Sequence, residues 1–271
     1  MTGQPLHLHK YAFQLEYRLL SVNRITLEKD WAYSDTKSVY NRIYFIEEGS
    51  GLLRFSDGKE VRMEKNQIYF IPVGACFTLT SNFLRKVYIH FRLNVHGIDL
   101  FEIAKPEYTR FSLSTIDFPG LLTSGSAGNL NGVLDINSLI MNLAGRFLGK
   151  NHNQADERLA LLQPYQKVLD YIYANLSPGL SIRSLSALVN LSDYYFSQKF
   201  KKTMGRSVKD FIADKLIEKS CAELACTGRK VREIADSLGF RDEYYFSRYF
   251  KQHTGQTPIQ YRKKMSSPVY S

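Results

Sequence analysis

The stretch Asp193-Tyr-Tyr-Phe-Ser-Gln-Lys-Phe-Lys-Lys-Thr-Met-Gly205 recurs in this chain with seven of its 13 positions unchanged. The second copy reads Glu243-Tyr-Tyr-Phe-Ser-Arg-Tyr-Phe-Lys-Gln-His-Thr-Gly255 and begins 50 residues after the first. Two tyrosines, two phenylalanines, a serine, a lysine and a glycine recur at the same positions. A repeat of this period predicts two copies of one supersecondary unit.

Each copy predicts a short amphipathic helix that ends at its glycine. Phe196 and Phe200 are four residues apart, as are Phe246 and Phe250, so each pair lies on one helix face and can be buried. The opposite faces carry hydroxyl, amide and basic groups. These polar faces are available to a partner.

A second short helix precedes each copy. The segments Ile182–Val189 and Val231–Leu238 have apolar residues at helical spacing, and turns at Asn190-Leu191 and Gly239-Phe240 follow them. Helix, tight turn and exposed polar helix is the helix-turn-helix plan, whose second helix enters the major groove of DNA. The alternative is two helical hairpins that only pack together; the basic and hydroxyl groups on both outer faces favour DNA binding.

Three motifs in the second unit resemble the signature of AraC-type transcriptional regulators. They are Val231-Arg-Glu-Ile-Ala-Asp-Ser-Leu-Gly-Phe240, Tyr245-Phe-Ser-Arg-Tyr-Phe-Lys251 and Gly255-Gln-Thr-Pro258, within a resemblance that covers Ser177 to Lys264. The resemblance implies a double helix-turn-helix domain that binds DNA.

The first unit departs from the family pattern at three positions. Ser186 stands where alanine is common, Asn190 where glycine is common, and Gln198 where arginine is common. These departures concern the sequence preference of the first unit and leave the expected fold unchanged.

The positive charge of the chain is concentrated on the repeat. The 271 residues carry a net charge of +10. Residues 177–271 hold 17 Lys and Arg against 9 Asp and Glu, which leaves only +2 for residues 1–176. This distribution favours binding to a polyanion such as DNA, although many soluble domains are basic without binding nucleic acid.

The cysteines and the apolar runs indicate a cytoplasmic protein. Cys76, Cys221 and Cys226 show no metal-binding spacing, which fits a reducing compartment. No apolar run approaches the ~20 residues that a membrane-spanning helix needs. The N-terminus lacks the apolar core of a signal peptide.

Residues 1 to about 105 alternate like short strands, which predicts a small barrel or jelly roll. Asp57-Gly58 predicts a hairpin, and further turns are expected at Gly49-Ser50-Gly51 and Val73-Gly74. The expected strands are Arg42–Glu48, Leu52–Ser56, Glu60–Met63, Gln67–Pro72, Cys76–Thr80 and Lys86–Leu93.

The turns at Gly49-Ser-Gly51 and Pro72-Val-Gly74 resemble the paired turns of a cupin barrel, over roughly residues 20–95. Such a barrel commonly precedes an AraC-type DNA-binding domain. Metal cupins use a His-x-His pair, a Glu and a later His. No His-x-His lies near Tyr40, and Phe77 holds the position of the later His. We therefore expect no metal, no cofactor and no enzyme activity; a cupin-type enzyme with a regulatory helical tail is the alternative reading, and an adaptor that binds protein is a third.

The barrel could still hold a small molecule, because its strands supply aromatic and polar groups of the kind that line ligand pockets. Each of these residues also has an ordinary reading, as core for the aromatic ones and as solvated side chain for the arginines. The candidate effector residues are Trp31, Arg42, Tyr44, Tyr88, His90 and Arg92.

The middle of the chain predicts a loop, a helix and a linker. The Gly- and Ser-rich segment 118–132 reads as a loop, Asp135–Leu148 as an amphipathic helix, and Gly149–Asp156 as a polar linker that continues loosely to Gln163. In the family such helices often form a dimer; packing on the chain's own barrel is the alternative. Pro164–Leu176 opens the second domain. The expected domains are residues 1–155, for sensing and dimerisation, and residues 160–271, for DNA binding.

One helix is expected between the repeats, over Ser207–Cys226, with Ser207 as its N-cap. Its buried positions should be Phe211, Ile212, Leu216, Ile217, Leu224 and Ala225. About 20 residues at 1.5 Å each span roughly 30 Å, close to the ~34 Å turn of B-DNA. Such a helix could hold two recognition helices over successive major grooves.

Together these patterns predict an α+β chain, with a cupin-like β-barrel followed by an all-α domain with two helix-turn-helix motifs. We expect a sequence-specific transcriptional regulator, acting as an activator, whose partners are double-stranded DNA, RNA polymerase, a small-molecule effector and a second copy of the chain. The expected base-contact residues are Tyr194, Ser197, Gln198, Tyr244, Ser247 and Arg248. The expected phosphate-contact residues are Lys201, Lys202, Arg241 and Lys251.

Overall fold

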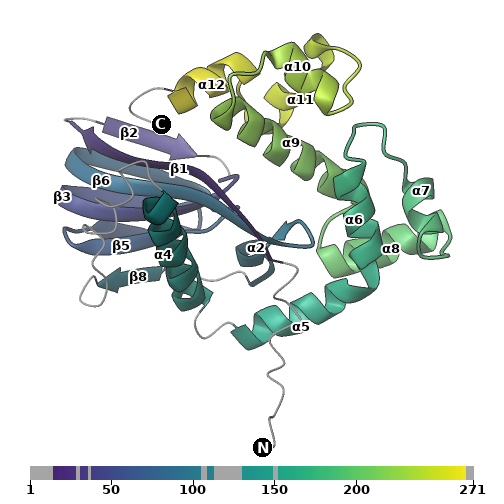
Figure 1. Cartoon of the computed structure of the whole chain (residues 1–271), viewed down its shortest axis with the longest axis horizontal. Helices are drawn as coiled ribbons and strands as arrows, with labels where there is room; N and C mark the ends of the chain where they lie inside the picture. Colours follow the sequence, from purple (N-terminus) through teal and green to yellow (C-terminus); the bar gives the residue numbers. More distant parts are fainter. Residues whose placement is uncertain are drawn as a thin grey trace, which may run out of the picture. The chain divides into compact units, whose positions relative to one another are not determined.

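The computed structural model describes residues 15–28, 31–35, 38–104, 109–112, 130–148 and 152–266. These residues form an N-terminal region built on a β-sheet and a helical C-terminal region, which confirms the α+β class (Figure 1). The chain divides into two compact units. One is built from Tyr17–Arg92 and Asp99–Asp156, and the other from Leu93–Ile98 and the residues from Glu157 onward.

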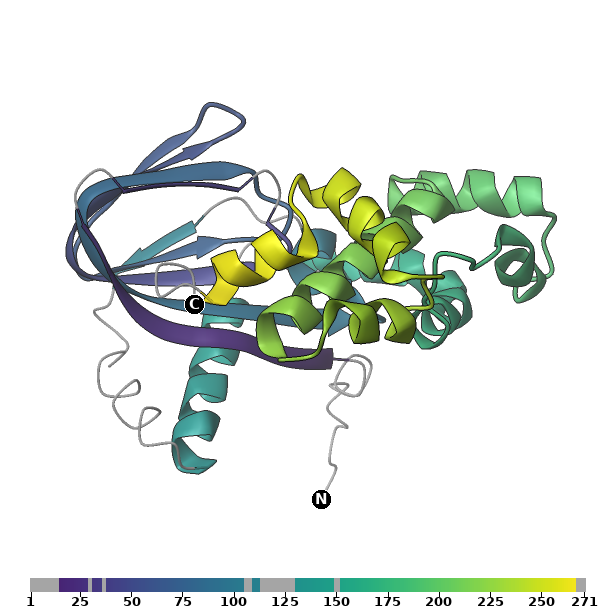
Figure 2. The same cartoon turned by 90° about the horizontal axis from the view of Figure 1, so that it is seen from above.

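The first unit is organised by one sheet, in which the order of the main strands is β1-β6-β3-β5-β8. Strands β2 and β7 also pair with β6, and β4 pairs with β3. Figure 2 shows that the long strands bend, so that the sheet curls over on itself like a barrel. The strands are β1 (Leu15–Leu27), β2 (Trp31–Asp35), β3 (Asn41–Phe55), β4 (Glu60–Met63), β5 (Gln67–Ile71), β6 (Phe77–Val95), β7 (Ile98–Asp99) and β8 (Thr109–Ser112).

The turn expected at Asp57-Gly58 is confirmed, and it joins β3 to β4 in an antiparallel hairpin. The turn expected at Pro72–Gly74 is also present, with Gly74 at φ 83°. The turn expected at Gly49-Ser50-Gly51 is wrong, because β3 runs through these residues without reversing.

Gly49 instead belongs to a β-bulge in the middle of β3. The register of β3 against β6 shifts between Ser50 and Leu52, and Gly49 has φ 78°. A Cβ atom on Gly49 would lie 2.2 Å from the backbone oxygen of Phe83. The glycine therefore permits a bulge and a close approach of two strands, which is a second common use of glycine in strands. The two strands predicted at Cys76–Thr80 and Lys86–Leu93 are likewise one strand. Cys76 directly precedes β6, and the other residues of both segments lie within it.

The two faces of the sheet have different partners. One face carries Ile89 and Phe91 of β6 and Phe70 of β5, and it packs on helices α2 (Leu100–Ala104) and α4 (Leu130–Leu148). The ring of Phe70 stacks on that of Phe147 with centroids 4.3 Å apart, and lies 4.5 Å from that of Phe101. Figure 1 shows α4 lying across this face. The alternate residues of β3 and β6 point to the opposite face, which curls inward.

The helix expected at Asp135–Leu148 begins five residues earlier, at Leu130, and so takes in the end of the predicted loop 118–132. Its predicted stripe is buried, with Ile136, Leu139, Ile140, Leu143 and Phe147 at 8% exposure or less. The loop's residues 118–129 lie outside the described part of the chain.

The polar linker expected after α4 is wrong over most of its length, because His152–Leu162 form helix α5. Ala155, Leu159 and Leu162 are buried and are four and three residues apart, so they give this segment an apolar stripe. Three apolar side chains at helical spacing outweigh the polar residues between them. The domain limits 1–155 and 160–271 remain a proposal.

The second unit contains two similar helix pairs and the helix between them. Phe196, Phe200, Phe246 and Phe250 are fully buried, as expected from their spacing. Val168, Leu169 and Ile172 are buried too, as expected for the helix that opens this unit. The helices are η2 (Gln163–Tyr165), α6 (Gln166–Ala174), α7 (Ile182–Ala187), α8 (Asp193–Met204), α9 (Val208–Cys226), α10 (Val231–Ser237), α11 (Glu243–Thr254) and α12 (Pro258–Ser266).

Candidate nucleic-acid interface

The two exposed helices of the repeat, α8 and α11, have matching ends. The N-cap side chains of Ser192 and Asp242 accept hydrogen bonds from the backbone N–H groups of Tyr195 and Tyr245, at 3.3 and 2.6 Å. The bond from Tyr245, followed by that from Arg241, lowers the pKa of Asp242. Both helices end at a glycine in the left-handed region, as predicted.

The turns before the two helices differ in chemistry but not in conformation. Asn190 has φ 54° and its counterpart Gly239 has φ 72°, so asparagine fills a left-handed position that glycine takes in the second unit. A side chain at Gly239 would crowd Ser177, because an added Cβ atom would lie 2.9 Å from the Cβ atom of Ser177. The first helix-turn-helix motif accommodates the side chain of Asn190 at the equivalent position. The departure at Asn190 therefore leaves the turn intact.

The outer faces of α8 and α11 are open to solvent. Tyr194 and Tyr244 are 76% and 73% exposed at the start of each helix. Gln198 and Arg248, one turn further along, are also exposed. Ser197 and Ser247 are half-buried at the margin of this face, and the hydroxyl of Ser197 donates to the backbone oxygen of Asp193 at 2.7 Å. The structure thus brings the six expected base-contact residues to two exposed helix faces; their contact with DNA stays a prediction.

The four expected phosphate-contact residues are exposed as well. Lys201, Lys202 and Lys251 lie in the last turns of α8 and α11. Arg241 is 85% exposed at its side chain, and its Nε lies 3.1 Å from a carboxylate oxygen of Asp242. Arg241 is therefore paired with Asp242 in this structure, and a DNA phosphate would have to replace this partner.

Sequence reasoning missed further basic side chains beside these faces. Lys199 lies on the flank of α8, with its Nζ 4.8 Å from the ring centroid of Tyr195. Arg183 of α7 and Arg232 of α10 are exposed on the first helices of the two units. Their equivalent places in the repeat, 49 residues apart, could have identified the last two.

Helix α9 connects the two helix-turn-helix motifs. Figure 1 shows the pair α7–α8 at one end of it and the pair α10–α11 at the other. Ser207 caps its start, accepting from the N–H of Asp210 at 3.1 Å, as predicted. Its 19 residues span about 28 Å. Phe211, Ile212, Leu216, Ile217 and Leu224 are buried, but the prediction for Ala225 is wrong, because it lies on the exposed side of the last turn.

One polar contact lies within α9, and another joins α9 to α12. Lys215 is almost fully buried in the helix, and its Nζ donates to both carboxylate oxygens of Glu218 at 3.1 and 2.9 Å. Arg262 of α12 donates to the backbone oxygen of Leu224 in the last turn of α9 and to that of Arg229 just after the helix. We expect a helix packed and held in this way to act as a rigid spacer.

The expected effector residues Arg42, Tyr44, Tyr88 and His90 lie together on the inner face of the sheet. Arg42 is directly opposite His90, and Tyr44 is directly opposite Tyr88. All four are buried, at 3–6% exposure. Burial raises the pKa of Tyr88 to about 12. The backbone of Trp31 pairs with Ser81 in β2, and its side chain lies outside the described atoms.

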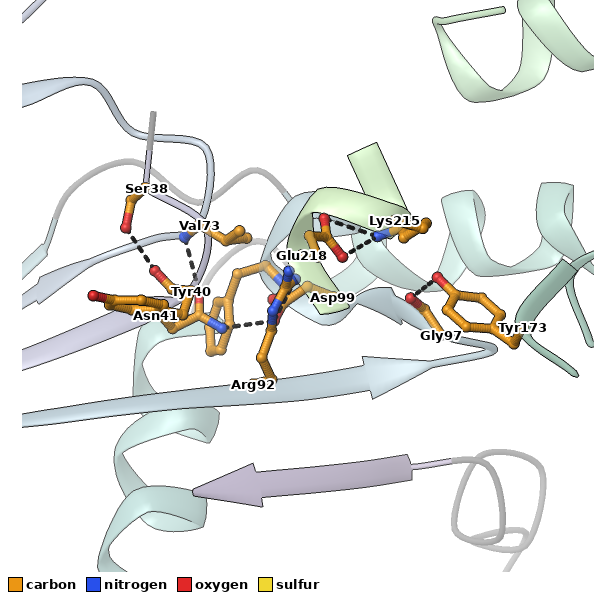
Figure 3. A network of polar contacts seen from close by, with 11 residues as sticks. Ser38, Tyr40, Asn41, Val73, Arg92, Gly97, Asp99, Tyr173, Lys215 and Glu218 are labelled. Carbon is orange, nitrogen blue, oxygen red and sulfur yellow. Dashed lines mark hydrogen bonds and ion pairs between the residues drawn. The ribbon is translucent and has the colours of Figure 1, made fainter. Parts of the chain in front are cut away.

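Arg92 belongs to a different network at the end of the sheet (Figure 3). Its Nη1 lies 3.9 Å from a carboxylate oxygen of Asp99, to which the side-chain amide of Asn41 donates at 2.8 Å. The other oxygen of Asp99 accepts from the N–H of Phe101 at 3.0 Å. These contacts join β3, β6 and the start of α2, and the part of Arg92 in effector binding stays a prediction.

Lys86 was not predicted, although it lies on the same inner face two and four residues before Tyr88 and His90. Its Nζ lies 3.5 Å from the ring centroid of Tyr44. The period-two alternation of β6 was sufficient to predict the face on which Lys86 lies, but not its burial.

Within the described ranges, no group of three or more His, Cys, Asp or Glu side chains could hold a metal ion. None of the helices described is both long and apolar enough to cross a membrane.

A helix-turn-helix domain family matches residues 185–264 of the chain. The HTH-type transcriptional activator Btr of Bacillus subtilis (strain 168) is 34% identical over 146 residues, which are 54% of this chain and 26% of Btr. The MmsAB operon regulatory protein of Pseudomonas aeruginosa is 30% identical over 95 residues, so the chain spans about a quarter to a third of the length of these two relatives. Residues 185–264 form an AraC-type helix-turn-helix domain.

Other comparisons extend beyond the AraC-type domain. The HTH-type transcriptional regulator YobQ of Bacillus subtilis (strain 168) is 24% identical over 240 residues, 87% of this chain and 91% of YobQ. The crystal structure of ToxT from Vibrio cholerae O395 covers 94% of this chain and 99% of its own, with a TM-score of 0.57 and 13% identity. At this identity the likeness to ToxT concerns the fold alone.

Proposed function

We propose that the chain regulates transcription by binding double-stranded DNA sequence-specifically through both units of its AraC-type domain. The observation that carries this proposal is the pair of recognition helices α8 and α11, whose exposed outer faces are joined by the buried helix α9. Two such faces on one spacer fit successive major grooves. An activating role follows the name of the relative Btr.

Affinity and sequence preference come from different side chains in this proposal. Lys201, Lys202, Arg241 and Lys251 neutralise phosphates, which supplies salt-dependent affinity without reading the sequence. The six residues on the outer faces read base edges in the groove. Arg248 is suited to guanine because its guanidinium can donate two parallel hydrogen bonds.

The N-terminal unit serves as sensor and dimerisation domain in this proposal. The inner face of the sheet offers aromatic and polar groups to an effector, and a solved structure of ToxT holds an unsaturated fatty acid. A second copy of the chain is proposed to pack on α4, where Leu130, Val133 and Leu134 are 73%, 46% and 55% exposed. RNA polymerase is the further partner that activation requires.

DNA binding is tested by selecting duplexes from a random pool with the full-length chain and measuring fluorescence anisotropy on the selected site and a shuffled one. We expect the selected site to bind about 10³-fold tighter or more. The affinity for both should fall steeply with salt, because each neutralised phosphate releases a counterion. Equal affinities for the two duplexes would contradict sequence-specific binding, and a salt-independent affinity would contradict the phosphate contacts.

A further inference from the structure

A cleft of about 480 Å³ lies in the first helix-turn-helix motif, beside its recognition helix. It is bounded by η2 and the start of α6, by the residues that follow α7, and by the flank of α8. All of these segments belong to the helical unit (Figure 1). The volume is within the range of binding pockets in proteins. We refer to this feature as the α6–α8 cleft.

The cleft is lined by apolar side chains beside two lysines. Leu188, Val189 and Leu191 are its aliphatic residues, and Leu188 is 37% exposed. Lys167 of α6 and Lys199 of α8 are its charged residues, and both are exposed. No acidic side chain is among the described residues that line the cleft. An apolar centre with polar groups around it is the usual composition of a protein-binding hot spot.

The repeat explains why this place is open in the first motif. The second motif has Phe240 at the position of Leu191 and Tyr249 at the position of Lys199. The rings of Phe240 and Tyr249 pack together with centroids 5.3 Å apart, and Phe240 is 5% exposed. Because the two motifs are built alike, these rings occupy the place that stays open beside Leu191 and Lys199. The cleft therefore distinguishes the first motif from the second.

The cleft lies on a different side of α8 from the expected base-contact residues. Successive residues are about 100° apart around a helix axis. Lys199 follows Gln198 directly and Tyr194 by five residues, so it lies about 100° and about 140° from them around α8. A partner in the cleft can therefore bind while the outer face of α8 holds DNA.

We propose that the α6–α8 cleft docks an acidic segment of a protein partner, with one large apolar side chain as its anchor. The aliphatic residues bury the anchor, and the acidic groups beside it pair with Lys167 and Lys199. A segment of a protein suits the cleft better than a small molecule, because the two lysines and Leu188 are open to solvent, whereas small-molecule sites bury most of their ligand. Only the simultaneous binding of DNA rests on the function proposed above.

The test measures the fluorescence anisotropy of three labelled nonapeptides with the full-length chain. The first peptide has a central tryptophan between acidic residues, the second has alanine in place of the tryptophan, and the third has the tryptophan between lysines. We expect the first to bind about 10-fold tighter or more than either of the others, and to weaken as salt rises. No binding of the first peptide, or equal binding of the first and either control, would overturn the proposal.

The second motif supplies the variant that closes the cleft. Leu191→Phe combined with Lys199→Tyr introduces the pair found at Phe240 and Tyr249, and it should abolish the preference for the first peptide. Should this double variant unfold, as judged by circular dichroism, the exposed Lys167→Glu takes its place.

Lys167→Glu should weaken the first peptide about 10-fold or more, because it puts a like charge beside the acidic residues. The matched control is Lys209→Glu, which reverses the charge of an exposed lysine of α9 outside the cleft and should keep the affinity close to that of the wild type. An unchanged preference for the first peptide in Lys167→Glu and in the folded double variant would contradict the α6–α8 cleft as the docking site.

A last titration adds the first peptide to the complex of the chain with its selected DNA site. At about 0.15 M salt, where charges beyond about 8 Å are screened, we expect the peptide to bind the complex within about 3-fold of its affinity for the free chain. Displacement of the DNA by the peptide would make the cleft a part of the DNA surface and contradict the docking site. If no DNA site is selected, the proposed DNA binding fails, while the peptide result on the free chain still decides the cleft.

Discussion

The hydroxyl of Ser186 donates a hydrogen bond of 2.5 Å to the carboxylate of Asp193, and so ties the first helix of one helix-turn-helix unit to the first residue of its recognition helix. The second helix-turn-helix motif has Ala235 and Glu243 at these two positions, with Ala235 fully buried. The departure of Ser186 from the AraC-type pattern is therefore matched by a nearby acceptor. It places a side-chain hydrogen bond between the two helices at a position where the second helix-turn-helix motif has an alanine.

This hydrogen bond should contribute measurably to stability. A double-mutant cycle with Ser186→Ala and Asp193→Ala is expected to give a coupling free energy of about 1 kcal/mol, measured by urea unfolding. The single variant Ser186→Ala should lose a similar amount. A coupling free energy of zero would mean that the contact adds nothing to the packing of α7 on α8.

Substitutions of Phe246 and Tyr244 should separate the core of the second helix-turn-helix motif from its expected DNA-binding face. Phe246→Ala should lower the free energy of unfolding by about 3–5 kcal/mol, because it leaves a cavity in a fully buried site. Tyr244→Ala, on the exposed face two residues earlier, should change it by less than about 0.5 kcal/mol and yet weaken DNA binding. Thermal unfolding and anisotropy on the same samples check both. A Phe246→Ala variant that melts like the wild type but fails to bind DNA would move Phe246 to the DNA surface.

Arg248 is expected to read a base and not only to attract phosphate. Arg248→Ala should weaken binding to the selected site by about 1–3 kcal/mol and relax one position of the selected sequence. The comparison is Lys251→Ala, which should weaken specific and random DNA by the same factor. If Arg248→Ala also weakens both equally, Arg248 contacts phosphate and the assignment is wrong.

His90 should make the stability of the chain depend on pH. Its pKa in the folded state is lowered below the usual 6.5, first by burial and then by Arg42 and Lys86. Between the two pKa values the unfolded chain binds a proton that the folded chain does not, so the contribution of His90 is fully present above about pH 6.5 and is lost as the pH falls. Urea unfolding at pH 5.5 and 7.5 should show a smaller difference for His90→Gln than for the wild type. An unchanged difference in His90→Gln would contradict the buried, neutral histidine.

The repeat made the C-terminal fold predictable, because Phe196, Phe200, Phe246 and Phe250 are buried by local helical spacing alone. The N-terminal sheet was harder to predict, since strand continuity depends on pairing between distant residues. Gly49 has the same sequence pattern in a bulge as in a turn, and only its contact with Phe83 on the neighbouring strand decides between them. Lys86 was missed for a related reason: a lysine in a strand is usually solvated, and only the curl of the sheet encloses it.

The central claim is that α9 holds two recognition helices rigidly over one duplex. The selected site should contain two boxes, the short sequences that the two recognition helices bind. The most direct test measures the affinity of the full-length chain for this site and for the same site with about 5 or about 10 base pairs inserted between the boxes, at one salt concentration. A half-turn insertion puts the second box on the far side of the duplex, and a full-turn insertion adds about 34 Å that a rigid spacer cannot bridge. We predict that both insertions reduce binding to that of a single box. Recovery of full affinity with the full-turn insertion would contradict the rigid spacer.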